Sequence, residues 1–109
     1  MEIREGGYLL RIFVGERDKH GHIPLYEAIV LKARETGLAG ATVLRGVMGF
    51  GRTSVMHTAK ILQLSEDLPM VVEIVDTLEK IEAFLPVLGA MVPAGLVTLE
   101  QVRVIEYRS

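Results

Sequence analysis

Two stretches of helical periodicity, each flanked by strand-like stretches, constrain the fold of this 109-residue sequence more than any other feature. The first covers residues 25–37 after a proline suited to a helix start, and Gly37 is a suitable stop. Its apolar stripe consists of Tyr26, Ile29, Val30 and Ala33. The second begins with Asp76 or Thr77 as N-cap, and Pro86 is expected to kink or weaken one of its turns. Its apolar residues are Leu78, Ile81, Leu85, Leu88 and Val92.

The remaining apolar stretches have strand character. They cover residues 8–16, 41–47, 59–65, 69–76 and 99–107, with a polar loop at 17–24 and a second loop at 92–98. Residues 59–65 are the expected antiparallel partner of 41–47, and 69–76 form a third strand of the same run. Apart from this additional strand, the order is β-α-β-β-α-β in a single domain, residues 1–109. This order predicts an α+β, ferredoxin-like sandwich in which one antiparallel sheet carries both helices on a single face.

Several of these strands are apolar on both faces. Leu9 and Phe13 alternate with Leu10 and Ile12, and residues 69–76 follow the same pattern. Helices on one face leave the other uncovered, and a large apolar sheet face is rarely exposed on a monomer. We therefore expect this face to be buried in a closed oligomer. Coverage by strand ends and loops is the alternative.

Composition narrows the function classes. Hydrophobic residues make up 50% and charged residues 24% of the chain, which is typical of a folded globular domain. A net charge of −2 argues against a nucleic-acid partner. The chain has no cysteine, which excludes disulfides and thiolate metal sites, and no signal-like or membrane-spanning stretch is evident. We expect a cytoplasmic protein.

Residues 45–60, RGVMGFGRTSVMHTAK, contain no acidic residue and three glycines. Gly49 and Gly51 can leave backbone N–H groups open to an anion, and Arg45 and Arg52 can pair with a phosphate or carboxylate. Phe50 can cover a base or an apolar ligand body. The glycine spacing is not that of a phosphate-binding fingerprint, so a solvated loop whose arginines bind nothing specific remains the alternative.

Other chemistry is less well supported by the sequence. His20 and His22 lie two apart in a loop with carboxylates nearby, and together with His57 they offer an alternative function as a metal-responsive trimer. The sequence has no recognisable nucleophile or acid–base motif, so we expect no enzyme activity and no catalytic residues. A small enzyme acting on a phosphorylated substrate is a further alternative. A trimer that binds a protein partner constitutively is another.

The sequence resembles the PII-like proteins of domain-of-unknown-function family 190. The similarity extends over residues 9–107 and rests on GERDKH, PLYEAIVLKARETGLAGATVLRGVMGFG, SEDLPMVVEIVD and GLVTLEQVRVIEY in combination. The resemblance implies a homotrimer that binds a small-molecule effector between subunits and signals through a loop at residues 49–58. It also leaves open a membrane channel or transporter as the regulated partner.

The resemblance implies ligand contacts as well. MGFGR is similar to the base of the signalling loop in nitrogen-regulatory PII proteins, which places Gly49, Phe50, Gly51 and Arg52 at the mouth of the cleft. Arg45 and His57 join this set from the composition of residues 45–60. The second half of the cleft corresponds to residues 91–98, which keep Gly95 but have neither lysine nor arginine. Thr98 and backbone amides there suit an adenine nucleotide of low charge, such as AMP, better than ATP.

Overall fold

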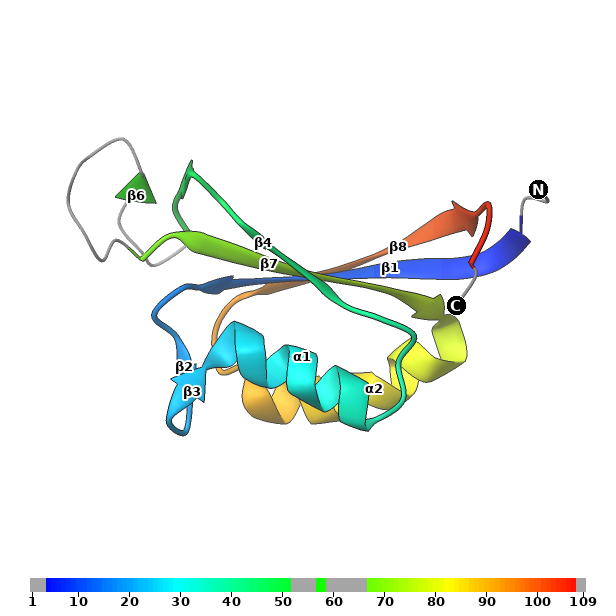
Figure 1. Ribbon diagram of the computed structural model, residues 1–109, viewed down its shortest axis with the longest axis horizontal. Coiled ribbons are helices and arrows are strands. Elements are labelled where there is room, and N and C mark those ends of the chain that lie inside the picture. The colour runs from blue at the N-terminus through cyan, green and yellow to red at the C-terminus, as the bar shows by residue number, and fades with distance from the viewer. Residues whose placement is uncertain (1–3, 52–56, 59–66, 108–109) are drawn as a thin grey trace.

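The predicted element order is confirmed by the computed structural model, which describes residues 4–51, 57–58 and 67–107 (Figure 1). Two short two-stranded ribbons are added to the predicted elements. The elements are β1 (Arg4–Gly15), β2 (Lys19–His20), β3 (Ile23–Pro24), α1 (Leu25–Glu35), β4 (Thr42–Arg45), β5 (Met48–Gly49), β6 (His57–Thr58), β7 (Pro69–Thr77), α2 (Leu78–Met91) and β8 (Leu96–Val104).

The main sheet has four strands in the order β4-β7-β1-β8, and every neighbouring pair is antiparallel. Both helices lie on the same face of this sheet (Figure 1). This arrangement is the α+β, ferredoxin-like sandwich that the sequence predicts. The predicted strand at residues 59–65 lies outside the described residues.

The core lies between the helices and the inner face of the sheet. Alternate residues of β1 and β7 point inward, as a period of two requires. The buried side chains are Leu10, Ile12 and Val14 from β1, Met70, Val72 and Ile74 from β7, Leu25, Ala28, Ile29 and Ala33 from α1, and Ile81, Phe84, Leu88 and Met91 from α2. Burying a side chain such as Phe84 stabilises the fold by about 1.5–3 kcal/mol.

The predicted stripe of α2 is wrong at one position. Leu85 is exposed, and Phe84 takes the core position between Ile81 and Leu88. Pro86 does not interrupt the helix, which continues from Leu78 to Met91. Pro86 is exposed, so the carbonyl of Glu82 that lacks its usual N–H partner can be hydrated.

The element ends follow local chemistry. Pro24, with φ −56°, precedes α1, and the helix stops two residues before Gly37, whose φ is +87°. Thr77 is the N-cap of α2, and its Oγ1 accepts a hydrogen bond of 3.3 Å from Lys80 N. Neither α1 nor α2, the helices of the described residues, has the length and apolar character needed to cross a membrane.

The strand boundaries need three corrections. β1 begins at Arg4 rather than at residue 8, because its N-terminal residues pair with β8. β4 is limited to Thr42–Arg45, and the chain bends soon afterwards at Val47. The final strand covers Leu96–Val104, so the predicted loop at 92–98 ends at Gly95. Residues 96–98 pair with Phe13, Ile12 and Arg11, which extends β8 toward Gly95.

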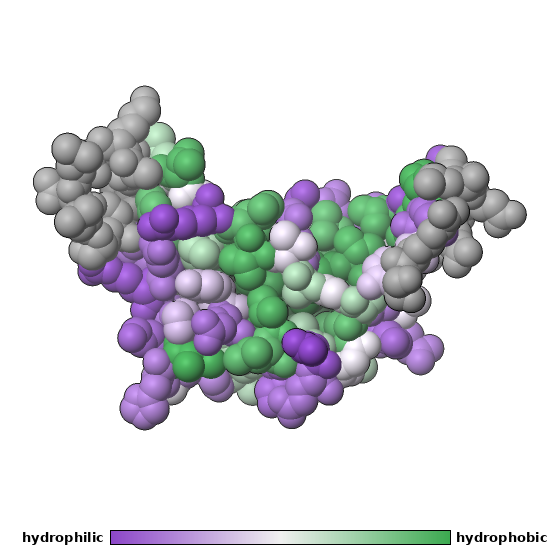
Figure 2. Space-filling view, viewed as in Figure 1, coloured by the Kyte–Doolittle hydropathy of each residue, from purple (hydrophilic) through white to green (hydrophobic). Residues whose placement is uncertain are grey.

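The outer face of the sheet, opposite the helices, has its side chains in cross-strand rows. One row is apolar and crosses all four strands: Leu44, Val71, Phe13 and Leu96. Leu44 and Leu96 are 49% and 56% exposed at the two edges, and Phe13 and Val71 are half-buried. Hydrophobic surface reaches solvent on the sheet side of the molecule as well as beside the helices (Figure 2). The expected second apolar face is therefore present.

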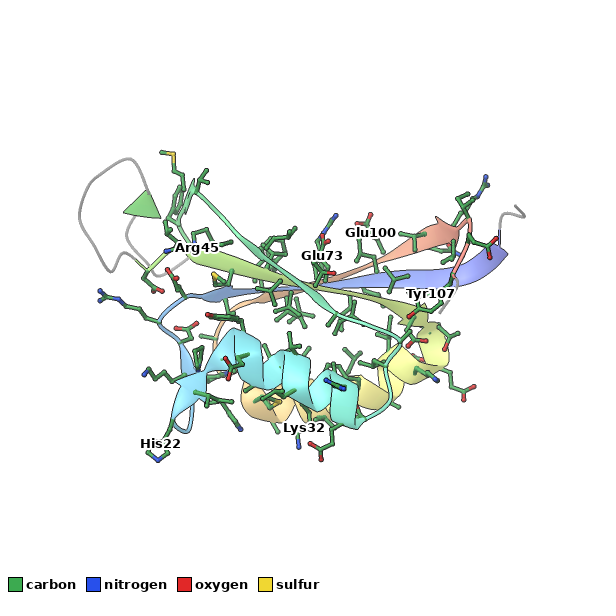
Figure 3. The ribbon with its side chains drawn as sticks, viewed as in Figure 1. His22, Lys32, Arg45, Glu73, Glu100 and Tyr107 are labelled. Carbon is green, nitrogen blue, oxygen red and sulfur yellow. The ribbon has the colours of Figure 1, made fainter. Side chains whose placement is uncertain are left out.

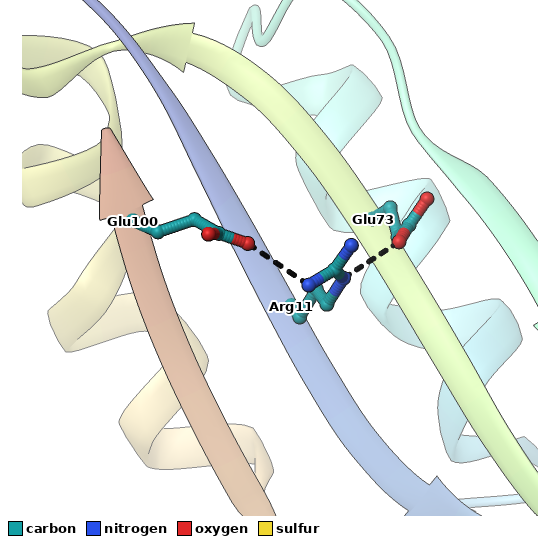
Figure 4. Close-up of polar contacts among 3 residues, drawn as sticks. All are labelled: Arg11, Glu73 and Glu100. Carbon is teal, nitrogen blue, oxygen red and sulfur yellow. Dashed lines mark hydrogen bonds and ion pairs between the residues drawn. The ribbon is translucent and has the colours of Figure 1, made fainter. Parts of the chain in front are cut away.

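The next row along the outer face is polar and consists of Thr42, Glu73, Arg11 and Thr98. Arg11 joins two neighbouring strands, because its Nε lies 2.7 Å from Glu73 Oε2 and its Nη1 2.9 Å from Glu100 Oε1 (Figure 4). The hydrogen bond to Glu73 raises the pKa of the Arg11 guanidinium above its ordinary value. The outer face thus has a paired ionic network beside its apolar row.

Candidate functional site

The segment that leads to the candidate loop, residues 49–58, leaves the sheet at the end of β4. There the chain passes very close to the start of β7. Gly46 N donates a hydrogen bond of 2.7 Å to Pro69 O. A Cβ atom on Gly46 would lie 2.6 Å from Pro69 Cγ, and one on Gly49 would lie 3.1 Å from the same atom. These two glycines therefore have a packing reason to be glycine, independent of any ligand.

A two-stranded ribbon forms the base of the candidate loop. Met48 pairs with Thr58, and Gly49 with His57, in β5 and β6. The predicted ligand residue His57 is thereby placed by its backbone opposite Gly49. Arg52, the residue favoured most for pairing with an anion, lies outside the described residues.

The turn that follows β1 is hydrogen-bonded to residues 67–68, which immediately precede β7. Glu16 N donates to Leu68 O at 2.9 Å, and Arg17 N donates to Asp67 Oδ1 at 2.8 Å. The exit of β1 and the start of β7 are consequently joined by both backbone and carboxylate hydrogen bonds. Sequence positions 15–18 and 67–69, far apart in the chain, form one corner of the molecule.

Arg45, the first predicted ligand residue, is bound to this corner (Figure 3). Its Nε lies 3.1 Å from Glu16 Oε2 and its Nη2 3.1 Å from Glu16 Oε1, which is a two-point fork. The Arg45 side chain remains 59% exposed, whereas that of Glu16 is only 27% exposed. Sequence reasoning missed Glu16: it lies within the GERDKH motif, but 29 positions separate the two residues and only the fold makes them neighbours.

Apolar side chains at the start of the loop face solvent. Val47 and Met48 are exposed, and Phe50 is 71% exposed. Gly51 is exposed as well. Phe50 is thus placed where it could cover a ligand's apolar body or contact a partner.

The second predicted half of the site lies at the start of β8. Gly95 has φ +152°, and a Cβ atom there would lie 2.6 Å from Phe13 O, so this glycine is required by its approach to β1. Thr98 is exposed on the outer face, where it pairs with Arg11 across the strands. Beside Gly95 is a shallow cavity of about 300 Å³. Its lining is apolar: Leu85, Leu88, Gly89, Val92, Pro93, Ala94, Gly95 and Val97.

The two halves do not meet within one chain. Arg45 ends β4 at one edge of the sheet, and Gly95 precedes β8 at the other edge. β7 and β1 lie between them, and three strand spacings separate the edges by about 14 Å. Both halves nevertheless belong to the same end of the sheet, because Leu44 and Leu96 share one cross-strand row.

The histidines are not gathered into a site in the part of the chain that the structure describes. His20 lies in β2 and His22 in the following turn, both exposed, with His22 at the tip of the β2–β3 ribbon (Figure 3). Within the described ranges, no group of three histidine, cysteine or acidic side chains could bind a metal ion.

The sequence of this chain matches a family of known proteins. The model of the DUF190 family, described as uncharacterized ACR, matches residues 7–104. A UPF0166 protein of Aquifex aeolicus (strain VF5) is 44% identical over 97 residues, covering 89% of this chain and 91% of the relative. A UPF0166 protein of Methanocaldococcus jannaschii is 36% identical over 78 residues, covering 72% and 71%.

Two solved structures share the fold. One is CPII, a nitrogen regulatory PII-like protein from Thiomonas intermedia K12, bound to ADP, AMP and bicarbonate. It aligns with a TM-score of 0.65 and 18% identity over 96% of this chain and 92% of that one. CPII bound to ADP and bicarbonate aligns with a TM-score of 0.63 and the same identity, over 96% and 93%. The sequence match and the shared fold together show that this chain belongs to the DUF190 family and has a PII-like, ferredoxin-like fold.

Proposed function

We propose that this protein is a cytoplasmic, homotrimeric regulator. It binds a small anionic metabolite, an adenine nucleotide in the first instance, in a cleft between subunits. The ligand changes the surface presented by residues 49–58, and that surface binds a regulated partner. We expect the protein to act by binding, without catalysing a reaction.

The separation of the two candidate halves is the observation that carries this proposal. Arg45 and Gly49 lie at the β4 edge of the sheet, and Gly95 lies at the β8 edge. A second subunit that approaches one edge can supply the missing half from its opposite edge. Three subunits joined in this way close a ring, which also hides the apolar row between Leu44 and Leu96.

The chemistry of the candidate residues supports a nucleotide. Arg45 and Arg52 supply positive charge, and Phe50 offers a face for a base. From the neighbouring subunit, Gly95 and Thr98 would contribute backbone amides and a hydroxyl. His57, paired by its backbone with Gly49, would lie beside them. CPII, which shares the fold, binds ADP, AMP and bicarbonate.

Regulation follows from a shift between conformations. A ligand that contacts residues 49–58 in only one arrangement favours that arrangement and the partner that fits it. A membrane channel or transporter is our proposed partner, because the exposed Val47, Met48 and Phe50 provide an apolar contact surface at the loop base.

Mass and ligand binding test the proposal together. Light scattering after size exclusion should give three times the 12.0 kDa of one chain. Calorimetry with AMP, ADP, ATP and bicarbonate should identify a ligand whose dissociation constant rises at least about tenfold in Arg52→Ala. Arg34→Ala, which removes an exposed arginine from α1, is the matched control and should bind normally. A 12.0 kDa monomer at micromolar concentration would contradict the intersubunit cleft.

A further inference from the structure

We propose that Glu16 is a latch on Arg45: an anionic ligand must displace the Glu16 carboxylate before it can bind the arginine, so Glu16 sets the affinity of the site. This inference rests on the proposed function, because it concerns the same ligand-binding end of the sheet. It adds a residue and a competition that the predicted set of ligand contacts does not contain.

The geometry of the ion pair is the first support. Glu16 uses both of its carboxylate oxygens, and Arg45 uses Nε and Nη2, the pair of donors along one side of the guanidinium. Two-point pairing of this kind is also how arginine recognises phosphate and carboxylate ligands. A ligand oxyanion that needs the same two donors therefore competes directly with Glu16.

The charge balance of the corner is the second support. Among the described residues of this corner, Glu16, Asp18 and Asp67 are acidic, and Arg17 and Arg45 are basic. Asp18 and Asp67 accept hydrogen bonds from the backbone N–H groups of Gly15 and Arg17. Their charges are thus fixed in place, and the carboxylate that can be exchanged at Arg45 is that of Glu16.

The position of the pair explains how its opening would be transmitted. Glu16 N donates to Leu68 O, and the residue after Arg45 donates through Gly46 N to Pro69 O. The chain before residue 46 and the chain after residue 67 therefore meet at this ion pair. When Arg45 leaves Glu16 for a ligand, the side-chain contact between the end of β4 and the turn after β1 is lost. The backbone hydrogen bonds of Glu16 N to Leu68 O and of Gly46 N to Pro69 O remain.

A set of three variants tests the latch. Glu16→Gln removes the charge, and Glu16→Asp keeps the charge but shortens the side chain by one methylene, so the fork cannot form at its present length. Both variants should bind ADP about fivefold more tightly than the unmodified protein, which is the scale of an exposed ion pair. Glu82→Gln, which changes net charge equally at an exposed position on α2, should leave the affinity unchanged.

Two probes, ADP and inorganic pyrophosphate, separate the latch from the nucleotide proposal. The Nε–H resonance of Arg45, measured by NMR, reports whether the bound anion contacts this arginine. Tighter ADP binding in both Glu16 variants, with a shifted Arg45 signal, supports both proposals. ADP binding that is equal or weaker in the Glu16 variants overturns the latch alone. Tighter pyrophosphate binding without any ADP binding keeps the latch and removes the nucleotide. No binding of either anion to any variant overturns both.

Discussion

A Cβ atom on residue 95 would lie 2.6 Å from the carbonyl oxygen of Phe13, because Gly95 passes directly against the backbone of β1. Gly95 also has φ +152°, a conformation that side-chain-bearing residues rarely adopt. The glycine that the family resemblance assigns to ligand binding therefore also has a structural role, since it turns the chain from α2 into β8.

Gly95→Ala should therefore lower the free energy of unfolding by about 2–4 kcal/mol, from backbone strain and from the clash with Phe13 O. Urea denaturation measures this change. Gly89→Ala is the matched control, because Gly89 lies in α2 and a Cβ there would meet no atom within 4 Å. It should stabilise the protein by about 0.5–1 kcal/mol. Equal effects of the two substitutions would contradict the steric role of Gly95.

Leu96→Glu should dissociate the proposed trimer. Leu96 is 56% exposed at the β8 end of the apolar row, so a charge there costs little in the monomer but much in a buried interface. Light scattering should show a single 12.0 kDa chain, with an unchanged far-ultraviolet circular dichroism spectrum. Leu31→Glu alters an exposed leucine on α1 and should leave the mass as it was. Dissociation in both variants would point away from the outer face as the interface.

The coupling between Arg11 and Glu73 should be stronger than that between Lys32 and Glu35. Both pairs reach solvent in a single chain, but a trimer would bury the outer face that carries Arg11. Desolvated pairs couple more strongly than solvated ones. Double-mutant cycles measured by thermal unfolding compare the two pairs directly. Equal coupling would show that the outer face stays in water.

The contribution of Arg11 should not change between neutral and moderately alkaline pH. Its hydrogen bond to Glu73 raises the pKa of the Arg11 guanidinium above its ordinary value. A raised folded-state pKa stabilises the fold fully below the unfolded-state value, and the effect is lost only as pH rises through the folded-state value. The difference in melting temperature between the protein and Arg11→Met should therefore be flat over this range. A difference that shrinks steadily above neutral pH would contradict this reasoning.

Asp76→Ala should destabilise the connection between α1 and β4. Asp76 Oδ2 accepts a hydrogen bond of 2.9 Å from Ala39 N, and Tyr107 OH donates one of 2.8 Å to Ala39 O. Loss of the carboxylate should cost about 0.5–1.5 kcal/mol and speed hydrogen exchange at the Ala39 amide. Asp76→Asn keeps an acceptor and should lose less. Exchange at the Ala39 amide in Asp76→Ala that equals that of the unmodified protein would contradict this role of Asp76.

The order of the elements could be predicted because each follows from a local period. Alternation along Leu10, Ile12 and Val14, and helical spacing in 25–37, persist wherever the chain packs. Boundaries were less accurate, since the start of β8 depends on pairing with β1, and the choice of Phe84 over Leu85 depends on how α2 is rotated against the sheet.

The sequence by itself determined the sandwich, its two-faced apolar sheet and the cationic, glycine-rich character of residues 45–60, because composition and periodicity are local properties. Only the tertiary structure decided that Arg45 pairs with Glu16, that Arg11 joins Glu73 and Glu100, and that Arg45 and Gly95 lie at opposite edges of one sheet. These relationships join residues from different strands, and their distances are fixed by strand order and register, which no single stretch of sequence contains.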